Sequence, residues 1–399
     1  MSVSRIGIVG AGTMGTGIAQ VAALGGFDTV LYDPDSQALE SGGLRIGEDL
    51  AKGESRGRWS EAESEAALER LDWLTSELAD LAGCELVIEA APERLALKRR
   101  LFTDLAGVLG PGAVLASNTS SLRVGEIAEG VPQPERVVGM HFFNPPALMK
   151  LVEIVATDRS SADALTAATE VAERMGRAPI RAKDSIGFVA NRLARPFTLE
   201  PLRMLADGVA DAEAIDRIVR LGGGFRMGPF ELLDLIGLDV NLEIARSFFT
   251  QGGEPERWRP SPIQEKLVAE GRLGRKSGHG YHRYEGVERK LDPELGILAP
   301  TLDPEKLARI DERAQEVLSR LFAQIANEAA YAREEGIASP DDMETAMELG
   351  FNWPVGPLKI AKLIGPVRSS ALLDQLQEAH GAAYAQAPLL RAEAEGASV

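Results

Sequence analysis

The first half of the chain alternates short apolar runs with helical patterns. Buried strands are predicted at Ile6–Val9, at Leu86–Glu89, and in the runs TVLYD, AVLAS, RVVGMHFF and KLVEIV. A helix of small residues follows the first run, and a helix that carries Lys98 follows Leu86–Glu89. Strands that alternate with helices are typical of a mainly parallel sheet. We therefore expect an α/β Rossmann-type domain at the N-terminus.

After the segment KDSIGF the pattern becomes helical, although Pro196 and Pro201 predict a kinked or broken first helix. This half of the chain repeats itself at a constant offset, the one that carries Gly208 to Gly336. A capping residue, Asp211 or Ser339, opens the middle helix of each copy, and Pro340 follows the second cap. The positions in phase are Gly208, Leu221, Gly222, Gly228, Pro229 and Gly237, which match Gly336, Leu349, Gly350, Gly356, Pro357 and Gly365. We expect an all-α C-terminal region made of two repeated helical units.

These patterns divide the chain into five predicted parts. The Rossmann domain spans residues 1–184, the first helical domain 185–285, a linker 286–304, the second, degenerate helical repeat 305–385, and a tail 386–399.

Composition narrows the classes of function. A net charge of −17 argues against nucleic-acid binding by bulk attraction. The single cysteine, Cys84, excludes an internal disulfide and suits a reducing compartment. No apolar run approaches the roughly 20 residues of a membrane helix, and the N-terminus enters a strand pattern too early for a signal peptide. We expect a cytoplasmic protein that binds neither nucleic acid nor membrane.

A glycine motif follows the first predicted strand. The spacing G-x-G-x-x-G between a strand and a helix is typical of a dinucleotide site, where the helix start holds the diphosphate. A glycine-rich turn without a ligand is the alternative. The next strand ends at Asp33, and no arginine follows in DPDSQALE. A carboxylate there binds the ribose 2′-OH and repels a 2′-phosphate, so we expect NAD rather than NADP. The residues of the motif expected to contact NAD are Gly10, Gly12, Thr13, Met14 and Gly15.

His141 and Glu153 interrupt two apolar runs that the segment NPPALM connects. In an antiparallel hairpin centred on Ala147 the two residues lie opposite one another, with Cβ atoms about 5 Å apart. A carboxylate at that distance fixes the tautomer of the ring and stabilises its charged form. The pair suits a general base. The alternative is a core histidine whose hydrogen bonds serve only the fold.

Two further polar groups, Glu93 with Lys98 and the cluster Ser117–Ser121, follow predicted strands, where open α/β sheets bind ligands. A helix cap is the alternative explanation for Ser120 and Ser121.

The segments GAGTMG, SNTSSL, HFFNPPALMKLVE, GFVANR and GGGFRMGPFELLDLIGLD together resemble the L-3-hydroxyacyl-CoA dehydrogenases over residues 4 to 285. The resemblance implies that His141 is the catalytic base and Glu153 its partner. It implies that Ser120 and Asn191 hydrogen-bond the substrate and that Asn144 shapes the site. The residues that it implies as NAD contacts are Asp33, Glu93, Lys98 and Asn118.

The implied reaction is reversible, NAD-dependent oxidation of (S)-3-hydroxyacyl-CoA to 3-ketoacyl-CoA, in fatty-acid or related acyl-CoA metabolism such as β-oxidation. Two alternatives stay open: a dehydrogenase of a free sugar acid such as gulonate, and a non-catalytic NAD-binding structural protein. Ser319 in the second copy matches Asn191 in the first, so the substrate amide is present once. In relatives with one helical unit that unit forms the dimer interface, so we expect a homodimer or a pseudo-dimeric monomer.

The phosphates of coenzyme A require cations in the predicted site. Candidates are Lys52, Arg56 and Arg58, although Asp49 stands about where relatives offer a serine, and a solvated charged helix is the alternative. We expect no metal site, and we expect His279 and His282 to be loop or surface residues.

Overall fold

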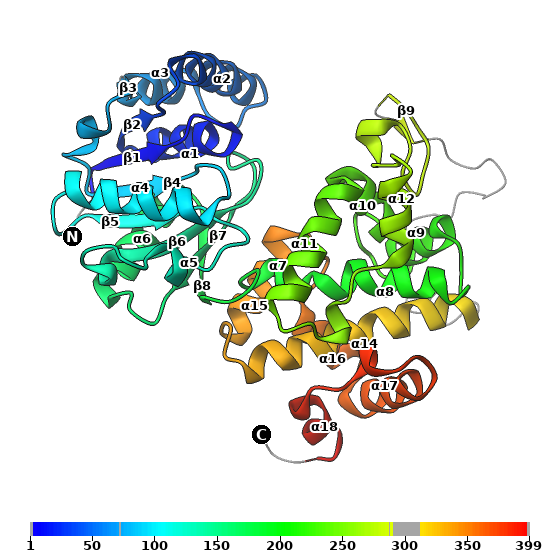
Figure 1. The fold of residues 1–399 in the computed structure, drawn as a ribbon. Coiled ribbons are helices and arrows are strands. Elements are labelled where there is room, and N and C mark those ends of the chain that lie inside the picture. The colour runs from blue at the N-terminus through cyan, green and yellow to red at the C-terminus, as the bar shows by residue number, and fades with distance from the viewer. Residues whose placement is uncertain (1–2, 72, 287, 290–311, 397–399) are drawn as a thin grey trace. The chain divides into compact units, whose positions relative to one another are not determined.

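A computed structural model of the chain describes residues 3–71, 73–286, 288–289 and 312–396 (Figure 1). The chain forms two compact units, Met1–Phe188 and Val189–Val399, which are described separately below. The predicted linker lies largely outside the described residues, as do residues 305–311 at the start of the predicted second repeat. No helix in the described ranges is long and apolar enough to cross a membrane.

The first unit is built on an eight-stranded sheet with the order β3-β2-β1-β4-β5-β6-β7-β8. The strands from β3 to β6 pair in parallel, β7 runs antiparallel to β6, and β8 is parallel to β7. The predicted Rossmann-type sheet is confirmed. The strands are β1 (Arg5–Val9), β2 (Asp28–Tyr32), β3 (Trp73–Thr75), β4 (Leu86–Glu89), β5 (Val114–Ser117), β6 (Val137–Phe142), β7 (Leu151–Ala156) and β8 (Ala178–Lys183).

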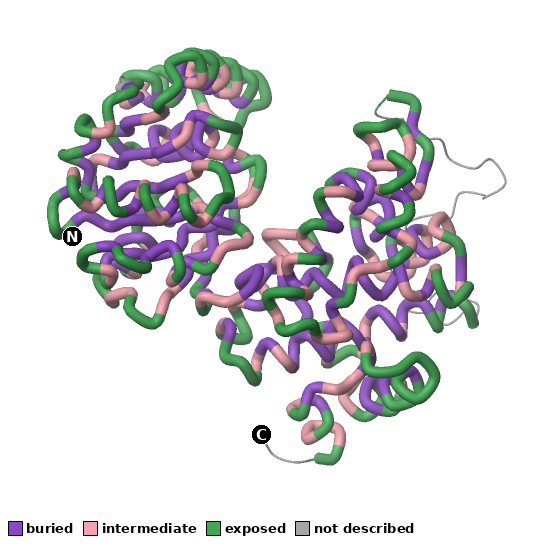
Figure 2. The backbone as a smooth tube through the Cα atoms, in the orientation of Figure 1, coloured by how far each residue is buried: buried purple, intermediate pink, exposed green. Residues whose placement is uncertain are grey.

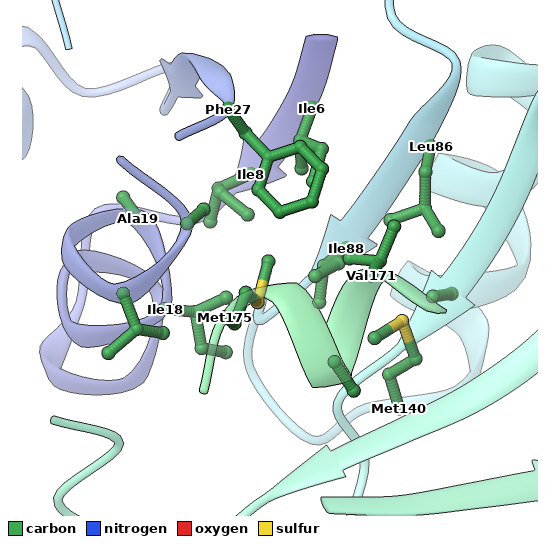
Figure 3. Packing of buried hydrophobic residues seen from close by; sticks show 14 of the residues in the cluster. Ile6, Ile8, Ile18, Ala19, Phe27, Leu86, Ile88, Met140, Val171 and Met175 are labelled. Atoms are coloured by element: carbon green, nitrogen blue, oxygen red, sulfur yellow. The ribbon is translucent and has the colours of Figure 1, made fainter. Parts of the chain in front are cut away.

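Helices cover the sheet, which explains why its central strands are continuous apolar runs rather than alternating ones (Figures 1 and 2). On one face Ile6 and Ile8 of β1 pack with Ile18 of α1 and Phe27, all of them fully buried (Figure 3). This face continues over β4 and β6 to Met175, so one core spans the sheet. The helices of this unit are α1 (Thr13–Leu24), α2 (Ser36–Ser55), α3 (Glu61–Arg70), α4 (Leu95–Val108), α5 (Val124–Ile127) and α6 (Ala162–Arg174).

The second unit begins with a broken helix. α7 ends at Leu193 and α8 begins at Arg195, with Pro196 in the first turn of α8 and Pro201 inside it, as predicted. Asp211 accepts a hydrogen bond from the Ala214 N–H and caps α9, as expected. The helices of the first copy are α7 (Ala190–Leu193), α8 (Arg195–Ala206), α9 (Ala212–Leu221), α10 (Pro229–Ile236), α11 (Leu238–Gln251) and α12 (Pro262–Ala269).

The second copy repeats this plan with an unbroken first helix. Ser339 caps α15 through the Asp342 N–H, as predicted. The glycine that ends the next helix has a positive φ in both copies, 99° at Gly237 and 81° at Gly365. The predicted duplication is therefore visible in the backbone. The helices of the second copy are α14 (Glu312–Glu334), α15 (Pro340–Gly350), α16 (Pro357–Ile364), α17 (Pro366–His380) and α18 (Pro388–Ala394).

Each copy also caps its third helix from the preceding one. In the first copy the carboxylate of Asp216 on α9 accepts hydrogen bonds from the N–H groups of Phe230 and Glu231 in α10. In the second copy Glu344, the counterpart of Asp216 at the offset of the repeat, does the same for Leu358 and Lys359 in α16. A shared tertiary contact of this kind shows that the repeat is structural as well as sequential.

The two copies pack on each other through reciprocal ion pairs between α7, α8 and α14. Arg192 of the first copy donates to Glu328 of the second at 2.9 Å, and Arg320 of the second donates to Glu200 of the first at 2.8 Å. The two pairs are related by the offset of the repeat, since Arg192 corresponds to Arg320 and Glu200 to Glu328.

Three further contacts are related by the offset of the repeat in the same way. Arg192 also pairs with Glu335, and Arg320 with Asp207, the corresponding residue of the first copy. The Phe225 ring packs against its own counterpart, Trp353, with centroids 5.4 Å apart. Reciprocal contacts, with a self-contact at the centre, are what a two-fold interface produces.

His282 lies in a loop, as predicted, and it is buried there: its Nε2 lies 2.7 Å from Asp216 Oδ2. Its backbone N–H also donates to Asp234. The ring thereby holds the loop before β9 (Tyr284–Glu285) against α9; β9 pairs with β10 (Glu288–Arg289).

Candidate active site

The glycine motif forms the turn between β1 and α1, and each glycine meets a different constraint. Gly10 has a φ of 106°, and a Cβ there would lie 2.8 Å from the Ala90 carbonyl oxygen. A Cβ on Gly15 would lie 1.7 Å from the Gly10 carbonyl oxygen, so this position allows helix and strand to approach. A Cβ on Gly12 would meet no atom within 4 Å. The backbone at Gly12 therefore faces open space, which suits the close approach of a diphosphate.

The start of α1 is equally suited to an anion. No side chain caps it, and its first turn holds no acidic residue. Thr13 is exposed and Met14 is partly buried at this end of the helix. Unused N–H groups and the helix dipole together favour a phosphate at such a position. These residues fit the NAD diphosphate that the motif predicts.

Asp33 follows β2 and connects it to the glycine turn. One oxygen of its carboxylate, Oδ2, accepts a hydrogen bond from the Ala11 N–H at 2.8 Å, and Oδ1 accepts one from the Asp35 N–H at 3.0 Å. Asp33 is therefore held beside the glycine motif, at the carboxyl end of the neighbouring strand.

A buried ion pair joins Glu89, at the end of β4, to Lys98 of α4. Lys98 Nζ lies 2.5 Å from Glu89 Oε1, and the Ser117 hydroxyl donates to Glu89 Oε2 at 2.7 Å. Lys98 is only 1% exposed, and its ammonium also lies 3.2 Å from Glu93. The ammonium is thus engaged inside the domain, and a direct contact with NAD stays a prediction. The sequence offered no sign of the role of Glu89, because it ends a strand pattern as an ordinary polar residue.

Glu93 organises the loop that carries Ser120. Its Oε1 accepts hydrogen bonds from the Thr119 hydroxyl, from the N–H groups of Ser120 and Ser121, and from the Ser121 hydroxyl. Partial burial opposes ionisation, but the Lys98 ammonium and these donors lower the pKa of Glu93 below its usual value.

The alternative that Ser120 and Ser121 cap a helix is wrong, because α5 begins later, at Val124. The N–H groups of Val124 and Gly125 at its start donate to Asp184 instead. The Ser120 residue is exposed, whereas its backbone is held by Glu93.

His141 and Glu153 face each other across β6 and β7, as the hairpin argument predicted. They are register partners, and His141 Nδ1 lies 2.6 Å from Glu153 Oε2. Glu153 is fully buried, and the imidazole is packed by Phe143 and Phe188, with ring centroids 4.6 and 5.7 Å away. Within the part of the chain that the structure describes, Nε2 makes no hydrogen bond. The ring is therefore fixed by one nitrogen and available through the other.

Nearby contacts hold this hairpin and the loop that follows His141. Asn118 Oδ1 accepts a hydrogen bond from the Phe142 N–H at 2.8 Å, so Asn118 anchors β6. Asn144 is exposed. Arg177 donates to the carbonyl oxygens of Pro146 and Met149, both at 2.9 Å. The sequence did not indicate Arg177, because arginine followed by a strand suggests only a surface charge.

The remaining predicted residues take no part in these contacts. In the second unit, Asn191 is half-buried in α7, and its counterpart Ser319 lies in α14. In the first unit, Lys52, Arg56 and Arg58 are exposed at the end of α2, and Lys52 pairs with Glu48 and Asp49. Across the described ranges no group of three or more His, Cys, Asp and Glu side chains could hold a metal ion.

Both units of the chain match models of one protein family. The model described as 3-hydroxyacyl-CoA dehydrogenase, NAD binding domain, matches residues 5–185. The model of the C-terminal domain of the same family matches residues 187–284 and 317–396. Both helical copies are therefore versions of one family domain.

Individual proteins that are similar to this chain bear names from the same family. The 3-hydroxyadipyl-CoA dehydrogenase of Escherichia coli is 35% identical over 99% of this chain and 98% of its own length. A crystal structure of 3-hydroxybutyryl-CoA dehydrogenase from the same species superimposes with a TM-score of 0.90, at 34% identity over 99% of both chains. A probable 3-hydroxybutyryl-CoA dehydrogenase of Deinococcus radiodurans is 41% identical, but its full length corresponds to only 70% of this chain. The chain belongs to the 3-hydroxyacyl-CoA dehydrogenase family of NAD-dependent oxidoreductases.

Proposed function

We propose that this chain oxidises the 3-hydroxyl group of an (S)-3-hydroxyacyl-CoA to a ketone, reversibly, in fatty-acid or related acyl-CoA metabolism. The observation that carries the proposal is the His141–Glu153 pair at 2.6 Å, which lies in the unit that matches an NAD-binding domain. The glycine motif and Asp33 would hold NAD, which would supply the acceptor for the hydride of C3.

His141 is the general base of this proposal. Its Nδ1–H is held by Glu153, so Nε2 is the nitrogen that accepts the proton of the substrate hydroxyl. The Glu153 carboxylate stabilises the imidazolium that forms, because an opposite charge at hydrogen-bond distance favours the charged ring. In the reverse direction the imidazolium returns the proton to the oxygen of the 3-ketoacyl thioester.

Three further residues position the substrate. Ser120 donates its hydroxyl to the reacting oxygen, and Asn191 donates its amide to the thioester carbonyl. Asn144 shapes the loop beside His141. The exposure of Ser120 and Asn144 supports this assignment, since neither residue is enclosed in the core. Arg56 and Arg58 hold the phosphates of coenzyme A with Lys52, whose charge Asp49 partly offsets.

Asp33 selects NAD. Because the carboxylate repels a 2′-phosphate, we predict that NAD is preferred over NADP by at least about tenfold, or ~1.4 kcal/mol. Asp33→Ala should shrink this ratio, with Asp35→Ala as a matched control on the adjoining loop. Steady-state rates with each cofactor measure the ratio, and equal use of both by the wild-type chain would refute the assignment.

We propose that the second helical copy takes the place of a partner subunit, which makes the chain a pseudo-dimeric monomer rather than a homodimer. The reciprocal pairs Arg192–Glu328 and Arg320–Glu200 support this proposal, because they are the contacts expected of a two-fold interface within one chain. Sedimentation at several concentrations measures the state, and a stable dimer of chains would contradict it.

A substrate screen tests the proposed function directly. NAD reduction is followed with (S)-3-hydroxybutyryl-CoA, 3-hydroxyadipyl-CoA, longer 3-hydroxyacyl-CoAs and free gulonate. We expect turnover of the thioesters only. Gulonate oxidation without thioester oxidation would favour the sugar-acid alternative, and no turnover of any of them would favour a non-catalytic protein.

A further inference from the structure

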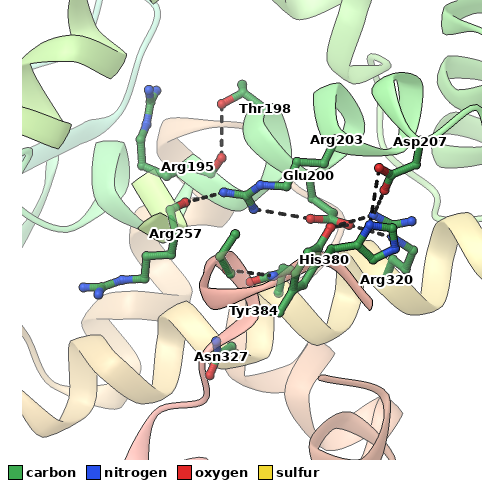
Figure 4. A network of polar contacts seen from close by, with 12 residues as sticks. Arg195, Thr198, Glu200, Arg203, Asp207, Arg257, Arg320, Asn327, His380 and Tyr384 are labelled. Atoms are coloured by element: carbon green, nitrogen blue, oxygen red, sulfur yellow. Dashed lines mark hydrogen bonds and ion pairs between the residues drawn. The ribbon is translucent and has the colours of Figure 1, made fainter. Parts of the chain in front are cut away.

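Arg195, the first residue of α8, is a buried arginine without a carboxylate partner in the described ranges. It is 5% exposed, and its guanidinium carbon lies 5.0 Å from the centroid of the Phe248 ring. Its Nε donates to the Asn191 carbonyl oxygen at 3.3 Å, while Nη1 is buried with no partner. Figure 4 shows the guanidinium pointing away from the carboxylates of Glu200 and Asp207. A buried charge in this state costs stability, because one hydrogen bond and one ring contact replace only part of the water that it loses.

The other buried arginines described in this unit have carboxylate partners that offset their charge. Arg192 contacts Glu328 and Glu335, and Arg320 contacts Glu200 and Asp207. Burial opposes the charge of both, but their carboxylate partners prevail and raise the pKa of each arginine. At Arg195 burial acts alone and lowers the pKa to about 10. The guanidinium stays charged at neutral pH and has no anionic partner among the residues that the structure describes.

The repeat shows that the fold does not require an arginine here. The residue that corresponds to Arg195 at the offset of the repeat is Ala323, which is fully buried in α14. By contrast, the paired Arg192 keeps its arginine counterpart, Arg320. The same helical position is therefore filled by a small apolar residue in the copy that also replaces Asn191 with Ser319. Arg195 and Asn191 occur together in one copy and are replaced together in the other.

We propose that Arg195 binds the distal carboxylate of a 3-hydroxyacyl-CoA whose acyl chain ends in a second carboxyl group. This inference rests on the proposed function, in which Asn191 holds the thioester carbonyl. α7 ends at Leu193 and α8 begins at Arg195, so Asn191 and Arg195 belong to consecutive short helices. The hydrogen bond from Arg195 Nε to the Asn191 carbonyl oxygen places the guanidinium beside the Asn191 backbone. The acyl chain that starts at Asn191 therefore passes within reach of the guanidinium.

A carboxylate is the anion that suits this position. The planar guanidinium binds a carboxylate through two parallel hydrogen bonds, and such bonds are strong where water is excluded. The relative named 3-hydroxyadipyl-CoA dehydrogenase, which matches nearly the whole chain, acts by its name on a thioester of a six-carbon dicarboxylic acid. A phosphate of coenzyme A is the competing anion, but it is common to all the substrates, so the two sources predict different results.

The test compares two substrates of equal carbon number, 3-hydroxyadipyl-CoA and 3-hydroxyhexanoyl-CoA, on the full-length chain. Arg195→Met should lower kcat/KM for the dicarboxylic thioester by about ten- to a hundredfold, mainly through KM, because a charged hydrogen bond to a remote group is lost. The hexanoyl thioester should change by less than about threefold. Arg195→Lys should fall between, since it keeps the charge without the paired geometry.

Thermal unfolding separates binding from folding. Arg195→Met removes an uncompensated charge and should not lower Tm, whereas the control Arg192→Met removes a buried cation from Glu328 and should lower it. Equal losses on both thioesters would overturn the inference in favour of a coenzyme A phosphate, and no loss on either would overturn it outright. A wild-type chain that oxidised neither thioester would overturn the proposed function as well, whereas full hexanoyl activity with no effect at Arg195 would overturn this inference alone.

Discussion

In the first helical copy Arg192 pairs with Glu328 of the second, and in the second copy Arg320 pairs with Glu200 of the first. These interface residues correspond one to one at the offset of the repeat. The residues assigned to the substrate do not: Asn191 becomes Ser319.

The two kinds of position differ in how strongly a substitution destabilises the fold. Replacing one member of a buried ion pair leaves the other charged and without water, which destabilises a fold by about 3–5 kcal/mol. Replacing a half-buried amide such as Asn191 leaves no buried charge behind. A second copy that only completes an interface can therefore lose its substrate groups but not its ion pairs.

A second, independent catalytic base would contradict this division of roles most clearly. His141→Ala removes the base of the proposed mechanism, and we predict that it lowers kcat by roughly 10²–10⁴-fold while NAD binding stays near normal. Glu153→Gln should also lower kcat, because the imidazolium loses its counter-charge. Stopped-flow and steady-state NAD reduction measure both. Activity near the wild-type level in His141→Ala would require a base elsewhere in the chain.

The reciprocal pairs can be broken one at a time. Glu200→Gln and Glu328→Gln each remove one of the two carboxylates that contact a buried arginine, so each should lower the free energy of unfolding by about 1.5–3 kcal/mol. Denaturant unfolding measures the loss, with Glu243→Gln on the exposed face of α11 as the control. A large loss at one site and none at the other would show that the two sides of the interface are not equivalent.

Removal of the carboxylates that cap α10 and α16 should also lower the free energy of unfolding, by a different amount in each copy. Asp216→Ala removes two hydrogen bonds to α10 and the partner of the buried His282, and we predict a loss of about 2–3 kcal/mol. Glu344→Ala removes the equivalent bonds to α16 from a more exposed site, for about 0.5–2 kcal/mol. Equal losses, measured in the same denaturation series, would mean that His282 adds nothing to the first cap.

Local periodicity was enough to predict much of this molecule. The alternation of residues along RVVGMHFF and KLVEIV determines which side chains share a face, so the register of His141 and Glu153 followed from the centre of the connecting loop. The glycines and prolines of the helical half require particular backbone angles, so their recurrence revealed the repeat. The break between α7 and α8 followed from Pro196 in the same way.

Contacts between distant polar residues were not predictable. Glu93 receives four hydrogen bonds from a loop that lies far from it in the sequence, and Ser117 donates to Glu89 because β4 and β5 end side by side. The burial of His282 was not predictable, because it depends on Asp216, which lies on a different element much earlier in the chain. The reciprocal pairs could be found only once the two copies were known to pack on each other, since the repeat alone does not say which residues meet.

The division of roles between the two copies is tested most directly by one matched measurement, kcat/KM of Asn191→Ala against Ser319→Ala with the same acyl-CoA. We predict a loss of roughly 10²-fold for Asn191→Ala, because a hydrogen-bond donor to the reacting thioester is removed. Ser319→Ala should stay within about twofold of wild type, since a serine outside the site contributes little. Comparable losses in both variants would contradict the account, because the second copy would then take part in the chemistry.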